Sequence, residues 1–543
     1  MKPRSRGEAA TAAGAPPGAT ARVARGEGDR ARRRVAVGVP ALVMLAVGLR
    51  GLDRNGMWRD EAVSFQVGRR TVPQIWRLLH DVDAVHGLYY LLVHAVLTVH
   101  PGEVALRLPS VCAAAVTAAL VAALGTRLLR PRAGLWAGLL YALTPMAGHY
   151  AQEGRSYALV AAGATGATLL FVRAVEEGSR ARAWAAYGAV LALTCWLHEF
   201  AVLLLCAHAA SLALTRAGAR AWRGWGCAAG GVAVSLVPMV LVSRGQAAQV
   251  AWLRRPTAVS AEELARAFFG PSGAVYAVCL CLVFAGLPGL VGRRGNVTLV
   301  GVALPLTVVP PVVLMLASQV SPLFVNRYVL YALSGAPLLV VAGAERVAGM
   351  AGRLPLGGRR VRPRLVVLAG VLAVGAGFLH QLPVLRADRD PGTRPDDLGA
   401  VSRVVAREAA EGDAVLFLPA PARNAALAYP GAFRGVRDVA LVEGAAGSGT
   451  LYGREAGPGE VRRRVARLDR VWVVADPGLL AGRRRPSNPV EQAKLAVLRR
   501  DFTGRKEVRR GGLVVRLYVR DPLSGPVSRP RSPLSGPPRP GRS

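Results

Sequence analysis

The chain has 543 residues, of which 52% are hydrophobic, with a mean hydropathy of +0.32 and a formal net charge of +36. This apolar fraction excludes an ordinary soluble enzyme, and the length exceeds that of a single domain. The basic residues are almost all arginines, in clusters between apolar runs of about 16 to 22 residues, the length that a helix needs to cross a membrane. They therefore predict membrane topology and argue against nucleic-acid binding.

Residues 1–34 are rich in Ala, Gly, Arg and Pro and lack the apolar stretch of a cleavable signal. This composition predicts a disordered cytoplasmic tail. The first apolar run covers residues 35–52, and because basic residues precede it, its carboxyl end is predicted to lie outside. Ten further apolar runs are candidate transmembrane helices. They cover residues 105–126, 133–150, 156–174, 182–197, 199–215, 226–243, 274–291, 297–318, 328–348 and 364–383.

Residues 86–100 form a short apolar segment with a histidine at each end. The segment is too short for a full crossing, so we expect an interfacial or re-entrant helix. Excluding it gives eleven spans and places the Arg-rich loops that follow in the cytoplasm, whereas counting it as a span would place them outside. The sequence thus predicts a multi-pass plasma-membrane protein with a cytoplasmic amino terminus.

The composition from residue 385 to 520 is that of a soluble α/β domain, which this topology places outside the cell. Residues 397–419 show a helical apolar period followed by a turn and a short apolar run. Residues 470–478 and 511–521 are typical of strands. The final segment, 521–543, repeats PLSGP and is rich in proline, which predicts a disordered tail.

Four polar clusters lie on the outer side under this topology. Ionisable groups near hydrocarbon cost roughly 2.5 to 3.5 kcal/mol each on insertion scales, and they often mark functional cavities. Each cluster alone also fits a structural role, such as a helix start, a local ion pair or a headgroup anchor. Their occurrence together on one face favours a functional site. The clusters are MWRDEAVSF (57–65), HYAQEGRSY (149–157), WLHEF (196–200) and SPLFVNRY (321–328).

These clusters, with HGLYYLLVH (86–94) and ALRLPSV (105–111), closely resemble the GT-C class of integral membrane glycosyltransferases. The nearest resemblance is to mannosyltransferase-like proteins related to protein O-mannosyltransferases and aminoarabinose transferases. It implies an α-helical polytopic catalytic domain over residues 35–384, with about eleven spans and an interfacial helix. Residues 385–520 resemble the variable extracytoplasmic domain of such proteins.

The resemblance implies an enzyme that moves a sugar, such as mannose, from a polyprenyl-phosphate donor to a glycan, lipid or protein acceptor on the outer face, with inversion. Inverting transfer needs a carboxylate to accept the acceptor's proton and cations to stabilise the departing phosphate. Asp60 matches the family's catalytic carboxylate and takes the base role, with Glu61 beside it. The other candidates are Glu153, which with Asp60 could also ligate Mg²⁺ or Mn²⁺; Arg155 and Arg327, for the lipid phosphate; and His86, Tyr150, His198 and Tyr328, on the cavity rim.

Two other functions also need polar groups that face a cavity. A transporter or flippase of polyprenyl-linked sugars would usually show internal repeats and charges near the midplane of the membrane. The ionisable residues here lie at the ends of outer loops instead. A non-catalytic membrane protein that binds envelope material is the second alternative, and loss of a product rather than of binding in an Asp60→Asn variant would exclude it.

Overall fold

The computed structural model describes residues 17–178, 180–246, 253–351, 363–388, 390 and 396–522. The chain divides into two compact units. The first comprises Met1–Gly56 and Val63–Arg394, and the second Met57–Ala62 and Pro395–Ser543. The short segment 57–62 therefore belongs to the C-terminal unit, although it lies near the start of the chain.

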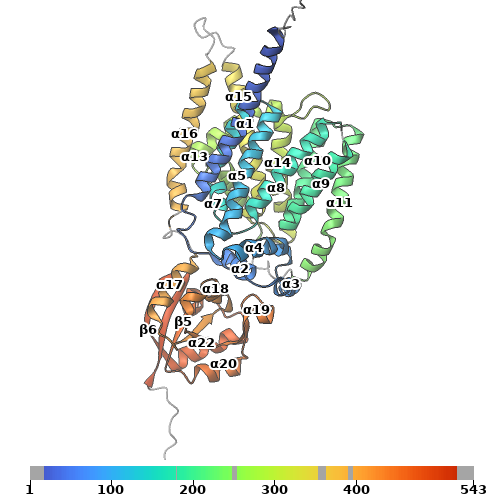
Figure 1. Cartoon of the computed structure of the whole chain (residues 1–543). Coiled ribbons are helices and arrows are strands. Elements are labelled where there is room, and N and C mark those ends of the chain that lie inside the picture. The colour runs from blue at the N-terminus through green and yellow to red at the C-terminus, as the bar shows by residue number, and fades with distance from the viewer. Residues whose placement is uncertain are drawn as a thin grey trace, which may run out of the picture. The chain divides into compact units, whose positions relative to one another are not determined.

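The first unit is built from packed helices (Figure 1). Figure 1 shows α9 beside α11 and α1 against α5, and these pairs are in contact. Small residues allow close approach: Gly134 lies so near the Ala122 carbonyl that a Cβ would not fit. The helices of the bundle are α1 (Pro17–Leu49), α5 (Glu103–Leu128), α6 (Pro131–Leu143), α7 (Pro145–Ala151), α8 (Tyr157–Glu176), α9 (Ala181–Leu197), α10 (Leu204–Thr215), α11 (Ala219–Arg244), α13 (Gly273–Gly286), α14 (Leu299–Val320), α15 (Ala336–Ala351) and α16 (Pro363–Asp388).

Each apolar run predicted as a span is helical over most of its length. The run at 133–150 is broken at Thr144–Pro145 into α6 and α7, because proline cannot continue the hydrogen-bonding ladder of α6. Helix α1 begins at Pro17, so residues 17–34 are helical and the expectation of a disordered segment does not hold there. Residues 1–16 lie outside the described residues, as does most of the tail predicted at 521–543.

Five helices of the described chain are long and apolar enough to cross a membrane, or six if the bent pair α12 (Ala258–Phe269) and α13 forms one span. The protein is therefore a multi-pass membrane protein. Eleven spans and the orientation of the termini stay predictions. Of the other helices that we expected to cross, α6, α7, α9, α10 and α13 are each shorter than the 18 residues that this criterion requires.

Three further helices follow the first span: α2 (Arg59–Gly68), α3 (Val72–Asp81) and α4 (Gly87–Val99), the last preceded by the 3-10 turn η1 (Ala84–His86). Helix α4 has 13 residues and is too short to count as a span, as its sequence predicted. In α3 the exposed Trp76 and the buried Leu78 show a strongly amphipathic helix.

The second unit is the α/β domain that the sequence predicted. Its five-stranded sheet has the order β2-β1-β5-β7-β6, with β1 parallel to β2 and β5, and β7 antiparallel to β5 and β6. The two predicted strands correspond to β5 (Arg470–Ala475) and β7 (Leu513–Arg520), the predicted helix to α17 (Leu398–Glu408), and the short apolar run after it to the strand β1 (Ala414–Leu418). The remaining elements include β2 (Arg437–Asp438), β3 (Leu441–Glu443), β4 (Arg454–Glu455), β6 (Phe502–Arg510), α18 (Asn424–Ala428), α19 (Ala445–Ser448), α20 (Pro458–Val465), α21 (Pro477–Leu480) and α22 (Pro489–Asp501).

A buried charge network links the helices and strands of this domain. The ammonium of Lys494 donates to both carboxylate oxygens of Glu455, at 2.7 and 2.8 Å, and to the Phe417 carbonyl. The guanidinium of Arg423 donates to Glu455 and to Asp438, each at 2.6 Å. Two cations and two carboxylates thus compensate one another, which burial of these charges requires.

Candidate functional site

Arg155 is the centre of a polar cluster in the first unit. It lies in the turn between α7 and α8 and is 7% exposed. Its Nη1 donates to the Ser64 hydroxyl at 3.2 Å, and its Nη2 lies 3.0 Å from Nε2 of His86. The main-chain carbonyl of Arg155 accepts from the Ser110 hydroxyl. Residues from two separate segments therefore hold the guanidinium, and a residue of a third holds its main chain.

His86 must accept this hydrogen bond through Nε2, because a guanidinium has only donors. The imidazole is then neutral and carries its proton on Nδ1. Burial lowers the pKa of His86 well below 6.5, and the nearby Arg155, His198 and Arg327 lower it further. Burial, with Arg155 and Arg327, also lowers the pKa of His198 to about 3. Both histidines are neutral at physiological pH, and the positive charge of the cluster resides on the two arginines.

Aromatic rings surround His198 and join it to the segment that carries Arg327 and Tyr328. Its ring centroid lies 4.8 Å from that of Tyr328 and 5.8 Å from that of Tyr157. Arg327 lies in the 3-10 segment η5 (Asn326–Gly335), and its Nε donates to the Tyr157 hydroxyl at 3.0 Å. Its guanidinium also lies 5.8 Å from the ring centroid of Tyr328, within cation–π range.

Two buried nitrogens at this cluster have no hydrogen-bond partner within the described part of the chain, Nδ1 of His86 and Nδ1 of His198. The two rings lie 6.4 Å apart. Buried polar atoms are almost always satisfied, so an unsatisfied pair beside two cations indicates a place where a ligand or water binds. The cluster therefore combines fixed positive charge with neutral donors and aromatic faces.

Glu153 stands at the border of the cluster and is 5% exposed. Its carboxylate lies 3.8 Å from Nε2 of His149, whose Nδ1 lies 2.7 Å from the Asp388 carboxylate. Tyr150 packs edge-on against both His149 and Tyr157.

Asp60 and Glu61 lie in the first turn of α2, where the helix dipole favours carboxylates. The Glu61 side chain is buried, and its carboxylate accepts from the Trp58 N–H at 3.4 Å. Both residues belong to the second unit. The structure thus brings together His86, Tyr150, Arg155, His198, Arg327 and Tyr328, with Glu153 at the border, whereas the roles of Asp60 and Glu61 stay predictions.

Within the described residues, no group of three or more His, Cys, Asp or Glu side chains could hold a metal ion. Asp60 and Glu153, the two predicted ligands, belong to different units.

Arg107 is a functional candidate that the sequence reasoning did not single out. This side chain on α5 is 1% exposed and donates to the carbonyls of Leu52, Asn55 and Gly56 at 2.8, 2.9 and 3.3 Å. It thereby fixes the loop that leads from the first span to Met57. The sequence already indicated the importance of Arg107, because an arginine inside an apolar run is costly in a membrane and usually has a functional or structural role.

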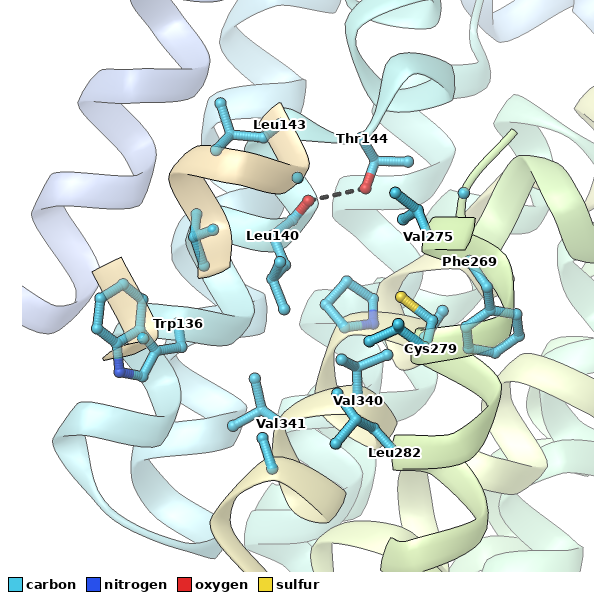
Figure 2. Close-up of a pocket in the computed structure, with 18 of the residues that line it drawn as sticks. Trp136, Leu140, Leu143, Thr144, Phe269, Val275, Cys279, Leu282, Val340 and Val341 are labelled. Carbon is cyan, nitrogen blue, oxygen red and sulfur yellow. Dashed lines mark hydrogen bonds between the residues drawn. The ribbon is translucent and has the colours of Figure 1, made fainter. Parts of the chain in front are cut away.

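A largely apolar cavity of about 700 Å³ lies elsewhere in the first unit (Figure 2). Figure 2 shows Leu140 of α6, Cys279 and Leu282 of α13, and Val340 of α15 around it. Thr144, which donates to the Leu140 carbonyl at 2.7 Å, lies at its edge and directly precedes α7, the helix that carries Tyr150. The cavity has the size and lining of a site for an apolar chain.

Comparisons with known proteins agree with this fold. The family described as dolichyl-phosphate-mannose-protein mannosyltransferase matches residues 87–243. Apo ArnT from Cupriavidus metallidurans superposes with a TM-score of 0.57 at 14% identity, over 88% of this chain and 97% of that one. ArnT bound to undecaprenyl phosphate gives a TM-score of 0.52 with the same identity and coverage. The apo oligosaccharyltransferase of Archaeoglobus fulgidus gives 0.51 at 10% identity, over 90% of this chain and 74% of that one.

No curated protein matches the sequence. The chain nevertheless has the fold of ArnT over most of its length, and the matched family segment begins at Gly87 in α4 and ends in α11. The resemblance to GT-C membrane glycosyltransferases related to protein O-mannosyltransferases and aminoarabinose transferases is confirmed.

Proposed function

We propose that the protein transfers a sugar from a polyprenyl-phosphate donor to an acceptor at the outer face of the membrane. The observation that carries this proposal is the pair of fixed guanidiniums, Arg155 and Arg327, beside the neutral His86 and His198 in a fold shared with ArnT. A guanidinium fork matches phosphate oxygens, and a structure of ArnT holds undecaprenyl phosphate.

In the proposed reaction the acceptor hydroxyl attacks the anomeric carbon of the donor sugar. The bond from that carbon to the phosphate oxygen breaks, and polyprenyl phosphate leaves with the negative charge, which Arg155 and Arg327 stabilise. Asp60 accepts the proton of the hydroxyl, and Glu61 with Glu153 orients the acceptor.

The apolar cavity of Figure 2 is the proposed site for the prenyl chain of the donor. Its lining has the surface that a hydrocarbon chain would bury, and Thr144 connects its edge to α7. A Leu282→Trp substitution would fill part of the cavity, because Leu282 lines it and is partly buried. We expect it to raise KM for a long-chain donor roughly tenfold while leaving that for a short-chain, water-soluble analogue unchanged. The exposed Val234 on α11, changed to Trp, is the control.

A deletion strain tests the proposed reaction. Mass spectrometry of its lipids should show an accumulated polyprenyl-phosphate sugar, and an envelope glycan should lack that sugar. A flippase would give the same two changes in cells. Purified protein in detergent distinguishes the two functions, because detergent removes the two membrane sides and a transferase alone would still form product.

A further inference from the structure

The segment that carries the two predicted catalytic carboxylates is held by the C-terminal domain. Residues 57–62 cluster with residues 395–543 rather than with the helical bundle. The N–H of Met57 donates to the Tyr429 hydroxyl at 2.6 Å, and the Met57 carbonyl accepts from the Leu398 N–H at 3.0 Å. Both backbone polar groups of this 1%-exposed residue are thus satisfied by residues of the α/β domain.

An ion pair extends this attachment toward the carboxylates. Nε of Arg59 donates to the Asp396 carboxylate at 2.9 Å. The Arg59 guanidinium also interacts electrostatically with Asp60, its neighbour in sequence. Because Asp396 is only 13% exposed at its side chain, the pair is more constrained than a fully exposed surface pair. Asp396 therefore competes with Asp60 for the same cation.

The contacts are made by residues at well-defined positions of the domain. Leu398 is the first residue of α17, and Asp396 lies two residues before it. Tyr429 directly follows α18, and its N–H donates to the Ala425 carbonyl. Ser402 of α17 donates to the same carbonyl, which fixes α17 and the end of α18 relative to each other. The residues that hold Met57 and Arg59 thus lie in or next to α17 and α18, which are packed together.

We propose that Tyr429 and Asp396 are positioning residues of the transferase, through which the C-terminal domain sets the place and the ionic pairing of Asp60. This inference rests on the proposed function. Tyr429 anchors the main chain three residues before Asp60. Asp396 binds the Arg59 guanidinium, which also interacts with Asp60, so without Asp396 the attraction between Arg59 and Asp60 would strengthen. A general base that is shifted or paired with a cation accepts a proton less readily, so the domain would control turnover rather than donor binding.

The test uses the full-length protein with Tyr429→Phe and Asp396→Asn. We expect kcat to fall by roughly 10- to 100-fold in each variant, while KM for the donor stays within about twofold, because the donor contacts are untouched. Asp396→Glu, which keeps the carboxylate, should restore most of the turnover. Two matched controls lie in the same domain: Tyr518→Phe removes the hydroxyl that accepts from Arg516, and Glu408→Gln breaks the exposed pair with Lys506.

Hydrogen exchange gives a second readout that does not depend on activity. The Met57 amide should exchange faster in Tyr429→Phe than in Tyr518→Phe, since only the first loses its acceptor. Unchanged exchange, or turnover of both variants equal to the controls while Asp60→Asn is inactive, would overturn the inference. A wild-type protein without transfer activity would instead refute the proposed function, and the exchange experiment would still decide whether the domain holds the segment.

Discussion

The Arg155 guanidinium donates to Nε2 of His86 at 3.0 Å, and this contact fixes a neutral imidazole beside a permanent cation. The same guanidinium reaches Ser64 through its other terminal nitrogen. One planar group thus joins the turn before α8 to α2 and η1. The pair defines where an anionic substrate group could lie, because it places fixed charge beside the unsatisfied Nδ1 of His86.

Arg155→Lys should weaken donor binding by roughly 10- to 100-fold, the equivalent of losing one hydrogen bond to a charged group at about 1.5 to 3 kcal/mol. An ammonium keeps the charge but cannot reach Ser64 and His86 at once in the planar geometry of the guanidinium. Binding of a polyprenyl-phosphate sugar to purified protein measures the effect. Arg173→Lys, at an exposed position of α8, is the control, and equal affinity of the two variants would remove Arg155 from the site.

Arg107→Gln should lower the stability of the protein in detergent by about 1.5 to 3 kcal/mol, because three carbonyls of the loop at 52–56 lose a charged donor. Thermal unfolding monitored by circular dichroism checks this. Arg127→Gln, on the same helix, removes an exposed pair with Glu176 and should have a much smaller effect. Similar losses in the two variants would show that the loop does not depend on Arg107.

The second unit should lose stability in acid through Glu455. Burial alone would raise the pKa of this carboxyl, but Lys494 and Arg423 outweigh burial and hold the pKa below 4.5. A carboxyl with a lowered folded-state pKa contributes stability above its unfolded pKa of about 4.5, and the contribution is lost as the pH falls through the folded value. Calorimetry of the full-length protein should show the transition of this unit falling below about pH 4.5.

Glu455→Gln is the matching variant. It should lower stability at pH 7 by roughly 3 to 5 kcal/mol, because the fully buried Lys494 loses its counter-charge, and it should flatten the acid dependence. Glu460→Gln, which breaks exposed pairs on α20, should leave both properties almost unchanged. If the acid dependence of stability persists in Glu455→Gln, then other carboxylates cause it.

The sequence predicted those parts of the fold that depend on local composition. Long apolar runs predicted the long helices, and short apolar stretches beside turn residues predicted β1, β5 and β7. Helices α3 and α12 were not predicted because they are amphipathic and contain charged residues such as Arg77 and Glu262. A search for long apolar runs does not detect helices of this kind. The helical start at Pro17 was missed for the same reason.

In the candidate site too, the sequence predicted which residues take part but not all of their contacts. Polar residues at the ends of apolar runs identified Arg155, His86, His198 and Arg327, which the fold brings into one cluster. Their exact partners, such as Ser64 and Tyr157, depend on side-chain packing between helices. The attachment of Met57 to Tyr429 spans 372 positions in the chain, and no local pattern reports such a contact.

The role of Asp60 is tested most directly by single-turnover transfer with purified Asp60→Asn protein, with binding of the polyprenyl-phosphate donor measured on the same sample. Asparagine keeps the shape of the side chain and removes its basicity, so we predict unchanged donor binding and a rate lower by roughly 10² to 10⁴, the usual contribution of general base catalysis. Glu61→Gln should be milder. Near-native rates in both Asp60→Asn and Glu153→Gln would contradict the transferase mechanism.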